Sequence, residues 1–390
     1  MSAQMPGAGK IVRLEASRGL AALAVFFCHF FLGLFSPWLS ASGASDVLPG
    51  SLVGHWYFAF VSGDAAVVFF FVLSGYVLSI KPLATRNPRH IQTSLIRRWP
   101  RLVPLVLISI LISWVLYRAG LYQFKMAAAL TGTHWHESWD LSVQNPSFLD
   151  AVWQGLFAVF FTGENYLNTN LWTMKREIMG SLYVFALTAL VLWRQRHISI
   201  CLFVLLLAVG MRQTLLPFLL GFLVALICSR RDMRGHWGVR LLLLAAGIYL
   251  LGYHSAIGDY RWVSFGGDGH PSLQHFLHKL MLPAGGALLL LFLLTGPVWN
   301  WLESRFGVWL GELSFPFYVM HTIVIWSWSS WAYLHLDMPL FLNLISSFML
   351  VILICLPLMR LDRVWVSYLK QVTTRRDRNL VSSLQSEGNT

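Results

Sequence analysis

The chain has 390 residues, of which 56% are hydrophobic and only 12% are charged, and its mean hydropathy is +0.61. Soluble domains carry about a quarter charged residues, so this composition excludes an ordinary soluble enzyme. The formal net charge of +12 does not indicate nucleic-acid binding, because the basic residues form short clusters between apolar segments. That arrangement is typical of a protein oriented in a bilayer.

Apolar segments near the length needed to cross about 30 Å of hydrocarbon recur along the whole chain. They predict an all-α, polytopic membrane protein with about ten transmembrane helices. The expected spans are 19–36, 56–80, 101–118, 177–193, 198–210, 212–228, 240–254, 275–294, 308–331 and 341–359. The fifth and the seventh of these are short for a bilayer crossing.

Every second connection between these spans is rich in arginine and lysine. The basic ones are the N-terminus, 81–101, 194–197, 229–240 and the tail, whereas 37–55 and 332–340 hold no basic residue and 255–274 holds only Arg261. Cytoplasmic loops carry the excess of basic residues. Both termini are therefore expected in the cytoplasm.

The connection 119–176 is long and is expected outside. Its piece 148–161 is apolar but too short to span, which predicts a re-entrant or interfacial segment. Residues 1–370 are expected to form a single transmembrane domain, and the polar segment 371–390 a disordered cytoplasmic tail.

No metal site is expected. The four cysteines lie in or at the ends of apolar runs without metal-ligand spacing. In the outer connection, His134 and His136 form only an isolated His-x-His pair.

Three ionisable residues, His29, Glu177 and His321, fall inside expected spans, where such groups are costly and usually face the bundle interior. Arg18 and His29 are eleven residues apart, which places them on one helix face, about 16 Å apart along the axis. Glu15 lies one turn before Arg18 on the same side, within pairing range. The topology puts His29, Glu177 and His321 at the same depth, where they would form an acid–base site.

Simpler interpretations exist for each residue alone. Arg18 suits an anchor at the membrane edge, and a single intramembrane histidine is often satisfied by a neighbouring serine or carbonyl group. Glu177 suits a helix cap or a partner of Lys175 or Arg176. The shared depth of the three ionisable groups is what favours a functional interpretation.

Five stretches, in order along the chain, resemble the motifs of one family. They are Leu14–Ala22 with His29, Phe69–Tyr76, Arg97-Arg98-x-x-Arg101-x-x-Pro104, Leu171–Glu177, and the stretch from Leu310 to His321 that includes Ser314 and Tyr318. Together they make the chain similar to acyltransferase family 3, which is marked by an Arg-x10-His arrangement in its first span. The chain departs from the family at Glu15, where aspartate is more frequent, and at Gly180 and Ser181, which replace a frequent Phe-Tyr pair.

The resemblance implies an O-acyltransferase of the bacterial inner membrane. Such enzymes transfer acetyl or another short acyl group, usually from acyl-CoA, most often acetyl-CoA, to a hydroxyl of an exopolysaccharide, a lipopolysaccharide or another glycan. Small-molecule acceptors also occur in the family. The expected partners are thus an acceptor glycan or small molecule and the lipid bilayer, without nucleic acid.

On this hypothesis, basic groups at the cytoplasmic side bind the donor phosphates through planar, permanently charged guanidinium groups. The candidates are Arg18, Arg97, Arg98 and Arg101. The cluster at 97–101 alternatively serves only to fix the topology. Ser74 and Gly75 are expected either to let the donor approach the backbone closely or to pack in the core.

The chemistry is assigned to the groups nearer the outer side. His29 is expected to act as general base on the acceptor hydroxyl or, as a second choice, as a transient acyl carrier. Glu177 would orient it or bind the sugar, and His321 is the second acid–base candidate. Tyr318 is expected to donate to the developing oxyanion and Trp172 to stack on a sugar ring, the alternatives being packing and an interface anchor.

The main rival is a proton-coupled transporter or exporter of a glycan or small molecule, since intramembrane His and Glu residues also serve proton relays. Against it, the sequence contains no duplicated halves of the kind many transporters have. A scaffold protein of an envelope-polysaccharide complex is a third possibility. Such a protein would tolerate loss of His29.

Overall fold

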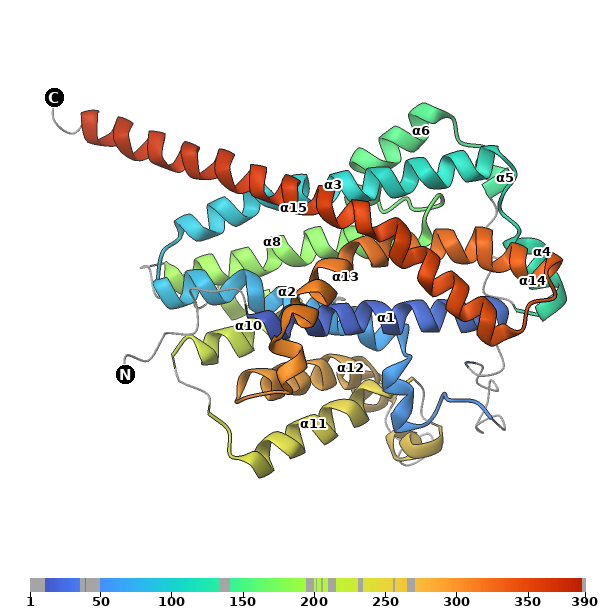
Figure 1. The fold of residues 1–390 in the computed structure, drawn as a ribbon. Coiled ribbons are helices and arrows are strands. Elements are labelled where there is room, and N and C mark those ends of the chain that lie inside the picture. Colours follow the sequence, from blue (N-terminus) through green and yellow to red (C-terminus); the bar gives the residue numbers. More distant parts are fainter. Residues whose placement is uncertain are drawn as a thin grey trace.

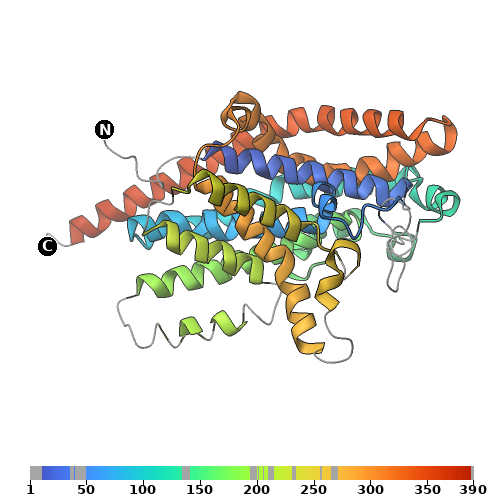
Figure 2. The same cartoon turned by 90° about the horizontal axis from the view of Figure 1, so that it is seen from below.

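The computed structural model describes residues 11–387 except 36–38, 40–49, 134–140, 194–199, 201, 205, 210–214, 231–233, 255–256 and 265–270. The side chains of 142, 143, 271–275 and the residues after Thr373 also lie outside that description. Within these limits the chain forms helices and no strand, as the sequence predicts. Figures 1 and 2 show an elongated bundle whose longer helices run side by side, with the last helix projecting beyond it.

Among the described residues, six helical stretches are long and apolar enough to cross a membrane. They are α1 (Val12–Leu34), α2 (Gly63–Thr85), α3 (Arg89–Arg118), the part Phe276–Leu294 of α12 (Pro271–Leu294), the continuous stretch Arg305–His335, and the part Leu340–Thr373 of α15 (Leu340–Glu387). The stretch Arg305–His335 consists of α13 (Arg305–Val324), the π-helical turn η8 (Ile325–Ser329) and α14 (Ser330–His335).

Further helices complete the bundle. They include α8 (Trp172–Leu192) and the shorter α10 (Leu216–Cys228) and α11 (Trp237–Leu251), and the 3-10 turns η2 (Trp56–Phe60), η5 (Gly258–Ser264) and η7 (Asn300–Glu303). The expected span 198–210 lies partly outside the described residues. The span expected from residue 56 begins only at Gly63, because the Ser62 hydroxyl caps α2 by accepting from the Ala65 N–H.

Glycines bring the central helices together. α1 packs against α13 and α2, and α2 packs against α10. A Cβ added at Gly19 would collide with Leu310 of α13, and one at Gly75 or Gly221 would collide with backbone across the α2–α10 contact. Small residues allow such close helix approach inside membranes.

The connection 119–176 enters the bundle before α8 begins. It contains α4 (Phe124–Thr131), α5 (Leu141–Gln144), the helical stretch Phe148–Phe161 formed by α6 (Phe148–Trp153), η3 (Gln154–Ala158) and α7 (Val159–Phe161), and η4 (Thr169–Leu171). Asn168 and Asn170 are 0% and 1% exposed, and the Asn168 amide donates to the Val319 carbonyl over 2.8 Å. The polypeptide therefore reaches the bundle interior just ahead of Trp172.

The last helix is longer than expected. α15 continues to Glu387, so the segment 371–390, for which the polar sequence predicts a disordered tail, is helical as far as Glu387. No glycine or proline interrupts the chain between Pro357 and Gly388. Up to Thr373 this helix also packs along α3.

Candidate active site

Two histidines meet inside the bundle. His29 of α1 and His321 of α13 place Nδ1 and Nε2 3.0 Å apart, and their rings stack with centroids separated by 5.2 Å. His321 is fully buried, and its Nδ1 lies 3.1 Å from the Phe317 carbonyl oxygen one turn earlier. The predicted meeting of these two imidazoles is confirmed.

Their hydrogen bonds select one arrangement of protons. A carbonyl only accepts, so Nδ1 of His321 carries a hydrogen and donates it to Phe317. Nε2 of His321 then accepts the Nδ1–H of His29. As a result, Nε2 of His29 carries the lone pair of that ring, which is the form a general base requires.

Asn170 completes the histidine pair. Its amide nitrogen lies 3.0 Å from Nε2 of His321 and also donates to the Thr322 hydroxyl. The two hydrogens of this amide have acceptors in the Thr322 hydroxyl and the Tyr318 carbonyl, so Asn170 packs against the histidine pair and leaves the lone pair of the His321 Nε2 to His29. Asn170 stands in η4, so it depends on the inward course of the preceding connection.

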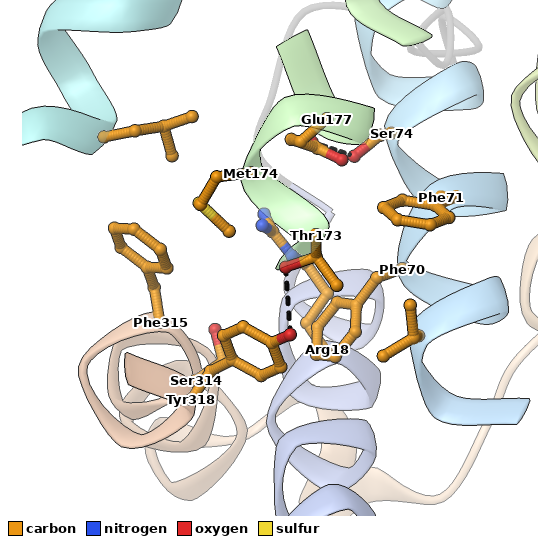
Figure 3. A pocket seen from close by; sticks show the side chains of 12 residues that line it. Arg18, Phe70, Phe71, Ser74, Thr173, Met174, Glu177, Ser314, Phe315 and Tyr318 are labelled. Carbon is orange, nitrogen blue, oxygen red and sulfur yellow. Dashed lines mark hydrogen bonds between the residues drawn. The ribbon is translucent and has the colours of Figure 1, made fainter. Parts of the chain in front are cut away.

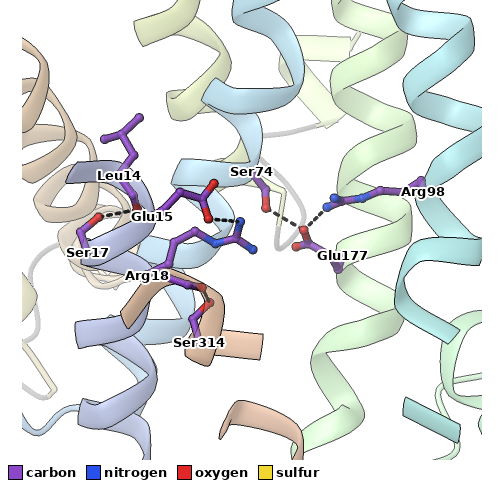
Figure 4. A network of polar contacts seen from close by, with 9 residues as sticks. Leu14, Glu15, Ser17, Arg18, Ser74, Arg98, Glu177 and Ser314 are labelled. Carbon is purple, nitrogen blue, oxygen red and sulfur yellow. Dashed lines mark hydrogen bonds and ion pairs between the residues drawn. The ribbon is translucent and has the colours of Figure 1, made fainter. Parts of the chain in front are cut away.

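A second polar cluster lies toward the N-terminal end of α1 (Figure 4). Glu177 of α8 forms an ion pair with Arg98 of α3 and accepts a 2.6 Å hydrogen bond from the Ser74 hydroxyl of α2. The Arg98 Nε donates to Ser181 over 2.7 Å. The Glu177 and Arg98 side chains are each only 13% exposed, so this pair is largely withdrawn from water.

Arg18 joins this cluster from α1. Its guanidinium lies 3.8 Å from the Glu15 carboxylate, which confirms the predicted pairing on one helix face. Figure 4 shows Arg18 on the side of α1 that faces Ser74 and Glu177. Arg101 lies close enough to Arg18 and Arg98 for the like charges of the three guanidinium groups to repel one another.

Arg97 lies apart from the other three arginines. Its Nε donates to the Thr373 hydroxyl of α15 over 2.5 Å, and its Nη2 to the Lys370 carbonyl over 3.3 Å. Of the four arginines predicted to bind the donor, Arg18, Arg98 and Arg101 therefore gather in one place, whereas Arg97 faces the C-terminal helix.

Glu177 does not share the depth of the histidines, contrary to the prediction. The sequence-based topology starts α8 at the outer edge of the membrane. In the structure, α8 starts inside the bundle, because Asn170, two residues before Trp172, already contacts His321. Five further residues along α8, about 7.5 Å at 1.5 Å per residue, bring Glu177 to the arginine cluster.

Each of the two polar clusters borders a cavity. The smaller, of about 60 Å³, is lined by Arg18, Ser74, Glu177, Ser314 and Thr173 with apolar neighbours (Figure 3). The larger, of about 340 Å³, is lined by His29, Asp64, His254, Ser62 and Trp172 among others. Val67 and Tyr318 line both, so the cavities adjoin each other.

Tyr318 is the polar residue at this boundary. Its hydroxyl donates to the Asn170 carbonyl over 2.8 Å and lies 2.9 Å from the Thr173 hydroxyl (Figure 3). A tyrosine has a single hydroxyl proton, and here the protein itself uses it. The geometry therefore favours Tyr318 as a partition between the cavities over the predicted oxyanion donor.

The structure also shows what Gly75 and Trp172 contact. Gly75 faces the Phe218 carbonyl of α10 and does not line either cavity, so of the two expected alternatives the structure favours packing. Trp172 lines the larger cavity, with the Arg176 guanidinium 4.3 Å from its ring centroid.

The comparison with protein families decides the class of protein. A family model described as an acyltransferase domain, Acyl_transf_3, matches residues 11–360, nearly the whole chain. The chain belongs to acyltransferase family 3. No curated protein and no solved structure matches it. With its long apolar helices, the protein is an integral membrane acyltransferase.

Sequence reasoning missed three parts of the acyltransferase site. Asn170 lies two residues before the predicted Trp172 and Thr173 directly follows it. Their closeness to Trp172 in the sequence was the one signal that could have indicated them. Ser181 holds Arg98 although it stands where the family more often has an aromatic residue. In the described part of the chain, no three His, Cys, Asp or Glu side chains are placed to hold a metal ion.

Proposed function

We propose that this acyltransferase moves acetyl or another short acyl group from acyl-CoA to a hydroxyl of an exopolysaccharide, a lipopolysaccharide or another glycan. The donor enters at the arginine cluster and the acceptor at the cavity lined by His29. The observation that carries the proposal is the pair of adjoining cavities, one beside three arginines and the other beside the histidine pair. Membrane acyl transfer needs both kinds of site within reach of one another.

The arginine cluster suits the phosphates of the donor. A guanidinium offers five N–H donors in a fixed plane, and the bonds of Arg98 to Ser181 and Glu177 use two of them. Glu15 and Glu177 hold Arg18 and Arg98 in position. The thioester arm then extends through the smaller cavity toward His29, about 16 Å along α1 from Arg18.

The histidine pair suits removal of the acceptor proton. Nε2 of His29 takes the proton of the acceptor hydroxyl while that oxygen attacks the thioester carbonyl carbon. The tetrahedral intermediate then breaks its C–S bond, and the departing thiolate receives the proton from His29. His321 accepts the Nδ1–H of His29 throughout, which stabilises the imidazolium that forms between the two proton transfers.

The larger cavity suits the acceptor. Small-molecule sites commonly measure about 300–1,000 Å³, and this cavity falls at the lower end of that range. Trp172 supplies an aromatic surface, while Asp64 and His254 supply polar groups for sugar hydroxyls. The basic connections support a position of the arginine cluster and both termini on the cytoplasmic side of an inner membrane.

Acceptor-dependent release of coenzyme A tests the proposal. The purified protein in detergent is given acetyl-CoA and a panel of glycan acceptors, and free thiol and acylated product are both measured. The wild type should release thiol only with an acceptor. His29→Gln should be slower by about 10²–10⁴-fold, the usual contribution of a general base, whereas His335→Gln, at an exposed histidine of α14, should retain full activity.

The outcomes are separable. Full activity of His29→Gln would refute the role of His29 as base. If the wild type releases no thiol with glycans or small hydroxylated molecules but moves a solute in response to a pH gradient, the transporter alternative replaces the proposal.

A further inference from the structure

The C-terminal part of α15 packs on the arginine-bearing part of α3. The match to the acyltransferase family ends at residue 360, whereas α15 continues to Glu387. Between Trp365 and Thr373 it contacts the first half of α3, and Figure 1 shows the two helices crossing before α15 projects beyond the bundle. The part of α15 that follows the matched region therefore lies beside the donor arginines.

The first contact occurs at a weak point of α3. Pro104 has no N–H, so the Pro100 carbonyl loses the i+4 donor that an α-helix normally supplies. The indole N–H of Trp365 takes its place, donating to the Pro100 oxygen over 2.8 Å. Arg98 and Arg101 stand on either side of Pro100, so this bond fixes the backbone that carries them.

The second contact holds a side chain of the same motif. Thr373 accepts the Nε–H of Arg97 over 2.5 Å, and the Lys370 carbonyl accepts from its Nη2 over 3.3 Å. Asp362, on the same segment, interacts electrostatically with Arg101. Residues 362–373 thus act on Arg97, on Arg101 and on the backbone between them.

We propose that Trp365, Lys370 and Thr373 of α15 form a positioning clamp that sets the affinity for the acyl donor. Trp365 and Thr373 are positioning residues: they orient the arginines of α3 without contacting the reacting atoms. The inference rests on the proposed function, because it takes Arg98 and Arg101 as part of the donor site. Arg97 is not a donor ligand here: by anchoring to α15, it holds the turn of α3 that carries Arg98 and Arg101. The clamp affects donor binding, and the histidine chemistry, about 16 Å away along α1, is independent of it.

Small side-chain changes in the full-length protein test the clamp. Trp365→Phe keeps a six-membered aromatic ring and removes the five-membered ring that carries the N–H, and Thr373→Ala removes the hydroxyl together with a methyl group, whereas Thr373→Ser keeps the hydroxyl. Val364→Ala is the matched control, because this residue is 68% exposed on the same helix. Loss of one hydrogen bond should raise the KM for acetyl-CoA roughly 3- to 10-fold. The kcat and the KM for the acceptor should stay within two-fold of wild type, about the scatter of such comparisons.

Binding of coenzyme A alone, measured by calorimetry, separates the two proposals without turnover. Weaker binding by Trp365→Phe and Thr373→Ala, with normal binding by Thr373→Ser and Val364→Ala, supports the clamp. If the wild type binds coenzyme A and every variant binds it equally, the clamp is wrong and the proposed function stands. If the wild type does not bind coenzyme A, both the clamp and the proposed function are wrong. Should Trp365→Phe fail to fold, the Thr373→Ala and Thr373→Ser pair decides.

Discussion

Replacing His321 would remove the acceptor of the His29 Nδ1–H while leaving His29 in place. In His321→Leu this N–H would lie beside a fully buried apolar side chain instead of a nitrogen 3.0 Å away. A buried N–H without an acceptor costs about 1–3 kcal/mol. At about 1.4 kcal/mol for each factor of ten, kcat should fall about 5- to 150-fold, less than on losing His29 itself.

A glutamine at this position provides the matched comparison. The amide oxygen of His321→Gln can accept from His29, so this variant should retain clearly more activity than His321→Leu. Thiol release at saturating acetyl-CoA and acceptor measures kcat for both, with thermal unfolding to verify that both are folded. The donor KM should not change, because the arginine cluster is distant. Equal kcat values for the glutamine and leucine variants, both folded, would refute the proton arrangement derived above.

Further predictions concern the arginine cluster, the helix packing and the acceptor cavity. Glu177→Ala leaves Arg98 largely buried without its counter-ion and should lower the free energy of unfolding by about 3–5 kcal/mol. Replacing both Glu177 and Arg98 by methionine should restore most of the melting temperature. The double variant should nevertheless fail to bind coenzyme A. A double variant as unstable as Glu177→Ala would contradict this. Gly75→Ala forces α2 away from α10 and should lower the free energy of unfolding by about 1–3 kcal/mol, measured by thermal unfolding in detergent. An unchanged melting temperature would mean that α2 and α10 can move apart without loss of stability. Asp64→Asn should raise the acceptor KM about ten-fold by weakening a charged hydrogen bond and leave the donor KM alone, and a change in the donor KM instead would move Asp64 out of the acceptor site.

Helix periodicity was sufficient for the parts of the site that lie on regular helices. Arg18 and His29 share a face of α1 because eleven residues are close to three whole turns. Histidines in α1 and α13 were placed at one depth because both helices cross the bundle without interruption. Depth derived from hydropathy is reliable for such helices, and the bond between His29 and His321 follows from it.

The same reasoning failed where the chain is irregular. The level of Glu177 depends on how far the connection 119–171 enters the bundle, and that depends on buried polar contacts such as those of Asn168 and Asn170. Periodicity contains no information about them. Likewise, hydropathy ends the last span near residue 359, whereas α15 continues beyond the apolar stretch, and contacts with α3 support it as far as Thr373.

The position of Tyr318 between two adjoining cavities has a consequence for traffic through the molecule. If donor and acceptor bind as proposed, each arrives and departs by its own end of the bundle, and neither has to pass the other. Only the acyl group travels past the aromatic side chain, so the protein can serve two aqueous compartments without the alternating inward- and outward-open states of a carrier. Spent coenzyme A and acylated product would leave in opposite directions, and the order of their release need not be fixed.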